Sequence, residues 1–241
     1  MRPILLAMLI CAIPLAAQTN TRVPVLLELF TSEGCSSCPP ADRLLESLDR
    51  QPVPNVDLIV LSEHVDYWNS LGWRDPFSSA FFSDRQKQYS DRLAATVYTP
   101  QLIIDGLISA LGSDQREVMQ GISKAAQNQK LPVSITPNAS GVHVEVTGGK
   151  DAGLKDAELY LVIAADRAQT QVLKGENGGH TLTHVAVVKT MKKIGKAASR
   201  DIPLAPQTGT TRVIAFLQDP RTGRILGAAQ TKAAQTKMEG H

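Results

Sequence analysis

The sequence contains very little cysteine. It has 3 cysteines in 241 residues, and Cys11 lies in an N-terminal apolar stretch that looks removable. The remaining two, Cys35 and Cys38, stand close together as Cys-Ser-Ser-Cys. A disulfide stabilises a fold by closing a loop of the unfolded chain, and so small a loop has little entropy to lose. Stapling of distant loops is therefore excluded, and redox chemistry explains the pair better.

The sequence also lacks a strong charge of one sign and a long internal apolar run. Its net charge is +2, which gives no basic footprint for nucleic acid. The one marked apolar run, Ile4 to Leu15, is too short to span a bilayer comfortably. With Arg2 before it and small residues after it, residues 1–17 are typical of a secretory signal peptide. We therefore expect no membrane span and a secreted or periplasmic protein in an oxidising compartment.

The first half of the chain alternates buried strands with amphipathic helices. Val25 to Phe30 and Asp57 to Ser62 are nearly continuous apolar runs, as in parallel strands covered on both faces. Between them, apolar residues recur at helical spacing after Pro39 and Pro40, which are tolerated in the first turn of a helix. This order predicts a strand–helix–strand unit with a right-handed crossover, and it places Cys-x-x-Cys at the start of the helix.

Further elements complete an α/β domain over residues 18–130. Residues 77–95 are predicted to be helical. Thr99-Pro100 opens a strand that ends at Asp105-Gly106, a hairpin signal, and 107–111 is its partner. Ser113 is expected to cap a third helix.

From about residue 131 the pattern changes to strict alternation of apolar and polar residues. Val142, Val144 and Val146 are an example, and segments 181–191, 211–218 and 224–231 continue it. This predicts an antiparallel all-β domain, sandwich-like, over residues 131–232, followed by a tail at 233–241.

A Cys-x-x-Cys at a helix start has a defined chemistry. The unpaired N–H groups and partial positive charge of the helix N-terminus stabilise a thiolate. Cys35 is then the nucleophile and Cys38 the resolving thiol. Two other interpretations stay open: a structural disulfide in a binding module, and a Cu(I) or other soft-metal site that adds His64.

Other candidate residues follow the predicted strands. His64 comes after the strand 57–62, on the sheet edge that Cys35 shares, and is a candidate for proton transfer with Asp66 orienting it. Trp68 either packs in the core or forms the wall of a substrate groove. Glu28, inside an apolar strand, would have a raised pKa and act as a general base if buried, or would point to solvent.

These features together resemble the thioredoxin superfamily over roughly residues 22–128. The resemblance implies that Pro100 is cis and faces the cysteine pair, and that Thr99 offers backbone hydrogen bonds to a bound peptide. Thioredoxins carry a buried carboxylate at nearly the place of Glu28, although the spacing here is one residue longer. The Ser36-Ser37 dipeptide matches neither the reducing nor the oxidising members, so the direction of electron flow does not transfer.

Within that superfamily the chain is similar to a secreted family known as domain of unknown function 1223. The similar segments are Glu28–Asp42, His64–Trp68, Tyr98–Gln101, Gly175–Asn177 and Thr181–Val185. This resemblance covers nearly the whole mature chain. It implies a thioredoxin-like domain followed by a β-rich domain, and it implies no established reaction.

The leading hypothesis is a secreted thiol–disulfide oxidoreductase that acts on protein or peptide thiols. Tyr98, Thr99 and Trp68 are the candidate substrate-contacting residues, and Glu28 or His64 handles protons. No organic cofactor is implied, because a dithiol carries the electrons itself. We expect the β domain to recognise a partner or mediate self-association, and His184, set among threonines, to lie on a solvent face.

Overall fold

The apolar periodicities produce a mixed α/β protein with one large sheet and few helices. The computed structural model describes residues 22–148 and 155–233, so the expected signal peptide and all but the first residue of the expected tail lie outside it. The first half contains β1 (Val23–Thr31), α1 (Pro39–Arg50), β2 (Val56–His64), α2 (Ala80–Leu93), β3 (Gln101–Ile104), β4 (Ile108–Leu111) and α3 (Gln115–Ala125). The second half contains β5 (Val133–Asn138), β6 (Gly141–Val146), β7 (Glu158–Gln171), β8 (Thr181–Lys196), β9 (Arg200–Pro203), β10 (Thr211–Gln218) and β11 (Ile225–Ala233).

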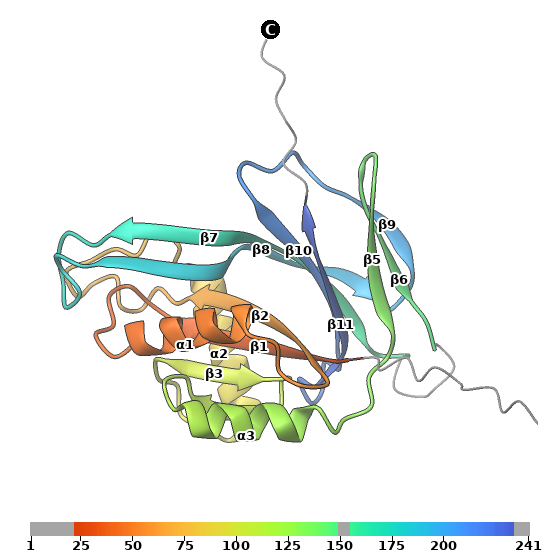
Figure 1. The fold of residues 1–241 in the computed structure, drawn as a ribbon, viewed down its shortest axis with the longest axis horizontal. Helices are drawn as coiled ribbons and strands as arrows, with labels where there is room; N and C mark the ends of the chain where they lie inside the picture. Colours follow the sequence, from red (N-terminus) through yellow and green to blue (C-terminus); the bar gives the residue numbers. More distant parts are fainter. Residues whose placement is uncertain (1–21, 149–154, 234–241) are drawn as a thin grey trace, which may run out of the picture.

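One sheet runs through both halves of the chain. Its eight strands lie in the order β11-β10-β7-β8-β2-β1-β3-β4. The expected parallel pair β1–β2 is present, and β2 joins the second half through a parallel contact between Ser62 and Val187 of β8. The long hairpin β7–β8 therefore extends to the side of the molecule where α1 begins (Figure 1). The division of the chain near residue 130 into two domains stays a prediction.

Helices cover both faces of the first half of this sheet. Figure 1 shows α1 and α3 on one side of the strands and α2 on the other. On the α1 side, Gly112 lies so close to Leu29 of β1, Ala41 of α1 and Pro100 that an added Cβ would touch all three. On the α2 side, Phe30 of β1 packs against Tyr89 of α2, with ring centroids 6.2 Å apart. Side chains of a strand alternate between its two faces. The positions of Leu29 and Phe30 therefore show which residues of β1 face α1 and which face α2.

A second layer of strands covers the other end of the large sheet. The order in this smaller sheet is β5-β6-β9. Its inward residues, Val142, Val144 and Ile202, share one apolar cluster with residues of β7 and β10. The antiparallel, β-rich character expected for the second half is therefore present. None of the helices within residues 22–148 and 155–233 has the length and apolar character needed to cross a membrane.

Two local expectations were wrong. The third helix is capped by Asp114 rather than by Ser113, because the Asp114 carboxylate accepts from the backbone N–H groups of Arg116 and Glu117. His64 is the last residue of β2 rather than part of the following loop, because β2 pairs with β1 as far as the Thr31–His64 register.

Candidate redox-active site

The Cys-x-x-Cys pair lies at the N-terminus of α1, as expected. Cys38 is the N-cap residue and Pro39 follows in the first turn. Cys35 and Cys38 form a disulfide with their Cα atoms 5.4 Å apart. Both cysteines have 0% of their surface exposed. Pro39 and Pro40 carry no N–H, and the N–H groups of Ala41 and Asp42 both donate to the Cys38 carbonyl, at 2.9 and 3.1 Å. What the start of α1 offers to a thiolate is therefore the partial positive charge of the helix end.

The segment that leads into β3 forms one wall of this site. The Thr99–Pro100 peptide bond is cis, which confirms the expectation drawn from the resemblance. The Thr99 hydroxyl donates to Cys35 Sγ over 3.4 Å, and the indole Nε1 of Trp68 donates to Thr99 Oγ1 over 2.8 Å. The structure thus brings Thr99, Pro100 and Trp68 to the disulfide.

Tyr98 is held from the α2 side instead. Its carbonyl accepts a hydrogen bond from Gln86 Nε2 of α2 at 2.6 Å, and its hydroxyl lies 3.4 Å from Ser109 Oγ. These contacts fix the backbone that leads into Thr99. The side chain of Tyr98 is engaged with β4, so a direct substrate contact by Tyr98 stays a prediction.

Glu28 lies on the opposite face of the sheet from the cysteines. Leu29 and Thr31 of β1 face α1, so Glu28 faces α2. There its carboxylate accepts from Arg85 Nε at 2.6 Å and from the Tyr89 hydroxyl at 2.5 Å. The neighbouring Glu63 is fully buried, and burial together with the charge of Glu28 raises the pKa of Glu63. Glu28 is buried, as one alternative required, but the structure does not bring it to the disulfide.

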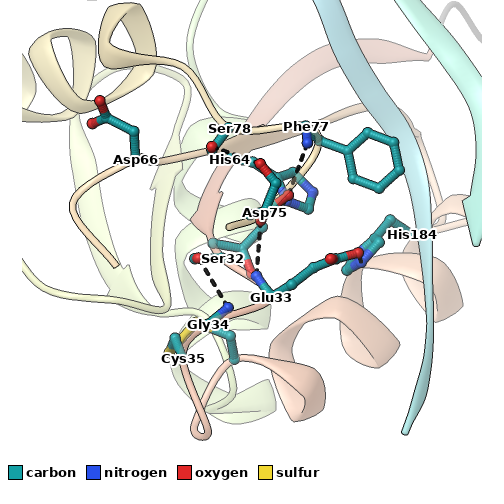
Figure 2. A network of polar contacts seen from close by, with 12 residues as sticks. Ser32, Glu33, Gly34, Cys35, His64, Asp66, Asp75, Phe77, Ser78 and His184 are labelled. Atoms are coloured by element: carbon teal, nitrogen blue, oxygen red, sulfur yellow. Dashed lines mark hydrogen bonds and ion pairs between the residues drawn. A yellow bond between two sulfur atoms is a disulfide. The ribbon is translucent and has the colours of Figure 1, made fainter. Parts of the chain in front are cut away.

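His64 is oriented by Asp75 and not by Asp66. His64 Nδ1 lies 2.7 Å from Asp75 Oδ2, and both side chains are fully buried. Figure 2 shows Asp66 directed away from this pair, and its carboxylate instead accepts from Ser83 of α2 at 2.6 Å. Burial acts to raise the pKa of Asp75, but His64 and the backbone N–H groups of Glu33 and Phe77 outweigh it and lower that pKa.

His184 belongs to the same buried network, so the expected solvent-facing position was wrong. Its ring lies 4.6 Å from the ring of His64 and has 0% exposure. His184 Nε2 is 3.3 Å from Glu33 Oε1, and His184 Nδ1 is 3.7 Å from Asp42 Oδ2 of α1. Burial acts to lower the pKa of His184, but the two carboxylates outweigh it and raise that pKa to about 10. His184 is therefore an imidazolium at neutral pH.

This network holds the backbone that leads into Cys35. The Glu33 N–H donates to Asp75 Oδ2 at 2.8 Å, as the dashed line in Figure 2 shows. The Glu33 carboxylate also accepts from Trp73 Nε1 at 2.8 Å. On the helix side, the Thr31 hydroxyl donates to Asp42 at 3.0 Å. The loop and the first turn of α1 are thus fixed from several directions by buried charged groups.

The second half of the chain contributes more than His184. In the turn between β7 and β8, Asn177 Nδ2 donates to the carbonyls of Glu33 and Cys35, both at 2.9 Å. Glu176 Oε2 accepts from the Ser36 N–H at 3.1 Å. Sequence reasoning assigned no role to Glu33, Asp42 or Asp75. The signal available for all but Asp75 was their inclusion in the segments that carry the family resemblance.

His64 is directed toward Asp75 and His184 rather than toward the sulfur atoms (Figure 2). Within residues 22–148 and 155–233, no group of three or more His, Cys, Asp or Glu side chains is arranged to hold a metal ion.

Comparison with solved structures finds two similar folds. The crystal structure of protein AGR_C_4864 from Agrobacterium tumefaciens is 27% identical, with a TM-score of 0.70, and the match covers 91% of this chain and 99% of that one. HBP35 of Porphyromonas gingivalis is 15% identical, with a TM-score of 0.54, over 91% of this chain and 79% of that one, and shows a likeness of fold alone. No curated protein matches the chain.

One family model matches the part of the chain that contains the cysteine pair, the cis-proline, His64 and His184. The family described as "Protein of unknown function (DUF1223)" matches residues 26–218, which is most of the chain. All of the similar segments noted in the sequence, from Glu28 to Val185, fall within this range. The chain therefore belongs to the DUF1223 family.

Proposed function

We propose that this protein is a secreted or periplasmic thiol–disulfide oxidoreductase whose first half is a thioredoxin-like domain. The observation that carries the proposal is the meeting of three parts: the Cys35–Cys38 disulfide, the helix N-terminus of α1, and the cis Thr99–Pro100 bond, with Thr99 Oγ1 3.4 Å from Cys35 Sγ. The substrates we propose are thiols of proteins or peptides.

The reaction requires no group beyond the two cysteines. A substrate thiolate attacks Cys35 Sγ, the Cys35–Cys38 bond breaks, and Cys38 leaves as a thiolate. A second substrate thiolate then attacks the mixed disulfide at the substrate sulfur. The substrate becomes a disulfide, and its two electrons reside on the reduced Cys35–Cys38 pair. The same steps in reverse reduce a substrate disulfide.

One observation favours a second candidate, a binding module whose disulfide is structural. Neither cysteine exposes any surface. An exchanging disulfide must offer one sulfur to an attacking thiolate, whereas a structural one gains from enclosure. The two candidates differ in the reduction potential that they require.

The deciding experiment is the equilibrium reduction potential of the pair in mature protein, measured against glutathione with alkylation of free thiols. An exchange protein is expected between roughly −120 and −270 mV, and the value then indicates the direction of electron flow. A potential below about −300 mV would identify a structural disulfide and overturn the proposal. Insulin reduction and oxidative refolding assays with Cys35→Ser as the inactive control test catalysis directly.

A further inference from the structure

The turn between β7 and β8 is bound directly to the Cys-x-x-Cys loop. Asn177, only 6% exposed, donates through Nδ2 to the carbonyls on either side of Gly34. Glu176 accepts from the next backbone N–H of the loop, that of Ser36. Three hydrogen bonds from one short turn therefore bind the backbone of Glu33, Cys35 and Ser36 in the Cys-x-x-Cys loop.

Two side chains outside the turn also lie against the Cys35 sulfur. Thr99 Oγ1 lies 3.4 Å from that sulfur and is itself bound by Trp68. Ser37 Oγ lies 3.3 Å from the same sulfur and within the loop. Thr99 adjoins the cis-proline at the start of β3, a strand paired on both sides with β1 and β4. Access to Cys35 past Thr99 therefore requires displacement of the segment that leads into β3.

The β7–β8 turn is attached more weakly. Gly175 and Gly179 bound its tip at φ values of 77° and 85°, and a Cβ added at Gly179 would have no atom within 4 Å. Leu173, beside the tip, is 70% exposed. A glycine at each end lets the tip change its backbone angles without moving the paired strands. Movement of the tip breaks the hydrogen bonds of Glu176 and Asn177 to the loop, together with the turn's own bond from the His180 N–H to the Asn177 carbonyl at 3.2 Å.

We propose that this turn controls access to Cys35, with Asn177 as a positioning residue that holds the turn against the loop. This inference rests on the proposed exchange at Cys35, but access itself is a chemical property that any small thiol can report. The Asn177 amide suits the role because its –NH₂ group has two donors for two carbonyls. Glu176 stays ionised at neutral pH, because hydrogen bonds from the side chain and backbone of Ser36 lower its pKa.

The test compares Asn177→Ala and Glu176→Ala with wild type. Asn138→Ala is the matched control, because Asn138 is a turn asparagine that bonds Asp201, far from the cysteines. The rate of disulfide reduction by dithiothreitol is measured by timed alkylation, and the equilibrium potential is measured against glutathione. Loss of two ordinary hydrogen bonds makes opening of the turn roughly tenfold or more easier. We expect that acceleration for Asn177→Ala, a smaller one for Glu176→Ala, and a rate within about twofold of wild type for Asn138→Ala.

The equilibrium potential separates access from a general structural effect. Freer access speeds reduction and reoxidation alike, so the potential of Asn177→Ala should equal that of wild type. Rates within twofold of wild type in both variants would overturn the proposal, as would faster reduction with a shifted potential. If Asn177→Ala does not fold, the rate measured for Glu176→Ala tests the proposal alone. That variant should fold, because the Glu176 side chain is exposed. A wild-type potential below about −300 mV would refute the proposed function and leave these rate comparisons measurable.

Discussion

The buried imidazolium of His184 makes a specific prediction about stability at alkaline pH. Its pKa is raised from 6.5 to about 10 by Asp42 and Glu33 against the opposing effect of burial. A cation favoured in the folded state contributes stability that is fully present below pH 6.5 and is lost as pH rises through 10. The two pKa values correspond to about 4 kcal/mol at pH 7 and about 1.4 kcal/mol at pH 9. The expected loss between pH 7 and 9 is therefore about 2.5 kcal/mol.

The perturbation that isolates this contribution is His184→Gln. It leaves the carboxylates of Glu33 and Asp42 buried without their cation, so we expect a loss of about 3–5 kcal/mol at pH 7. Because glutamine does not titrate, that loss should shrink as pH approaches 9. His143→Gln is the control, since His143 is 43% exposed and pairs with Asp201 on the surface. It should change stability by less than about 0.5 kcal/mol.

Urea unfolding at pH 6, 7, 8 and 9, with the disulfide intact, measures both effects. Groups outside this network titrate in wild type and variant alike, so the difference between the two curves reports His184 and the two carboxylates that it pairs with. Parallel curves for wild type and His184→Gln from pH 7 to 9 would show that His184 is not charged in the folded protein. The account of His184 as an imidazolium between Glu33 and Asp42 would then be refuted.

Two further predictions concern the fold around the site. Gly106 and Gly209 both have φ of +73°, but an added Cβ at Gly106 would lie 1.9 Å from the Gly223 carbonyl, whereas nothing lies within 4 Å at Gly209. Urea unfolding should show that Gly209→Ala lowers the free energy of unfolding by about 1–2 kcal/mol, which is the cost of the left-handed backbone alone. Gly106→Ala should lower it clearly more. Equal losses in the two variants would contradict the close approach at Gly106. Asp114→Ala should lower the free energy of unfolding by about 1 kcal/mol through loss of the α3 cap, and Ser113→Ala by less than about 0.5 kcal/mol. A larger loss for Ser113→Ala than for Asp114→Ala would identify Ser113 as the cap.

Local patterns in the sequence predict the elements that bear the cysteines. The apolar run at Val25–Phe30 falls within β1, and the two prolines after Cys38 open α1 as expected. The Asp105-Gly106 signal marks the β3–β4 hairpin. Each of these elements depends on residues a few positions apart in sequence. At that range, turn residues and side-chain periodicity determine the backbone conformation. The cis form of Thr99–Pro100 was expected from the family resemblance.

Contacts between distant segments were not predictable in the same way. The β2–β8 pairing joins Ser62 to Val187, and no local pattern states which strand lies beside which. His184 was placed on a solvent face because threonines flank it, but the face it occupies is covered by α1, where Asp42 meets it. Asp66, two residues from His64 in sequence, was expected to orient it. The chain after Asp66 instead folds back and places Asp75 at hydrogen-bond distance from His64.

Glu28 shows how one residue of spacing decides which chemistry is available. Side chains of a strand alternate between faces, so Glu28, one residue before Leu29, faces α2 rather than α1. On that face, Arg85 and Tyr89 bind its carboxylate. The charged groups on the cysteine side are instead Glu33, Asp42, Asp75 and His184, and they act on the loop through hydrogen bonds to its backbone and to α1. Strand periodicity therefore separates two buried charge clusters, and the cluster on the α1 face is the one that holds the cysteine loop.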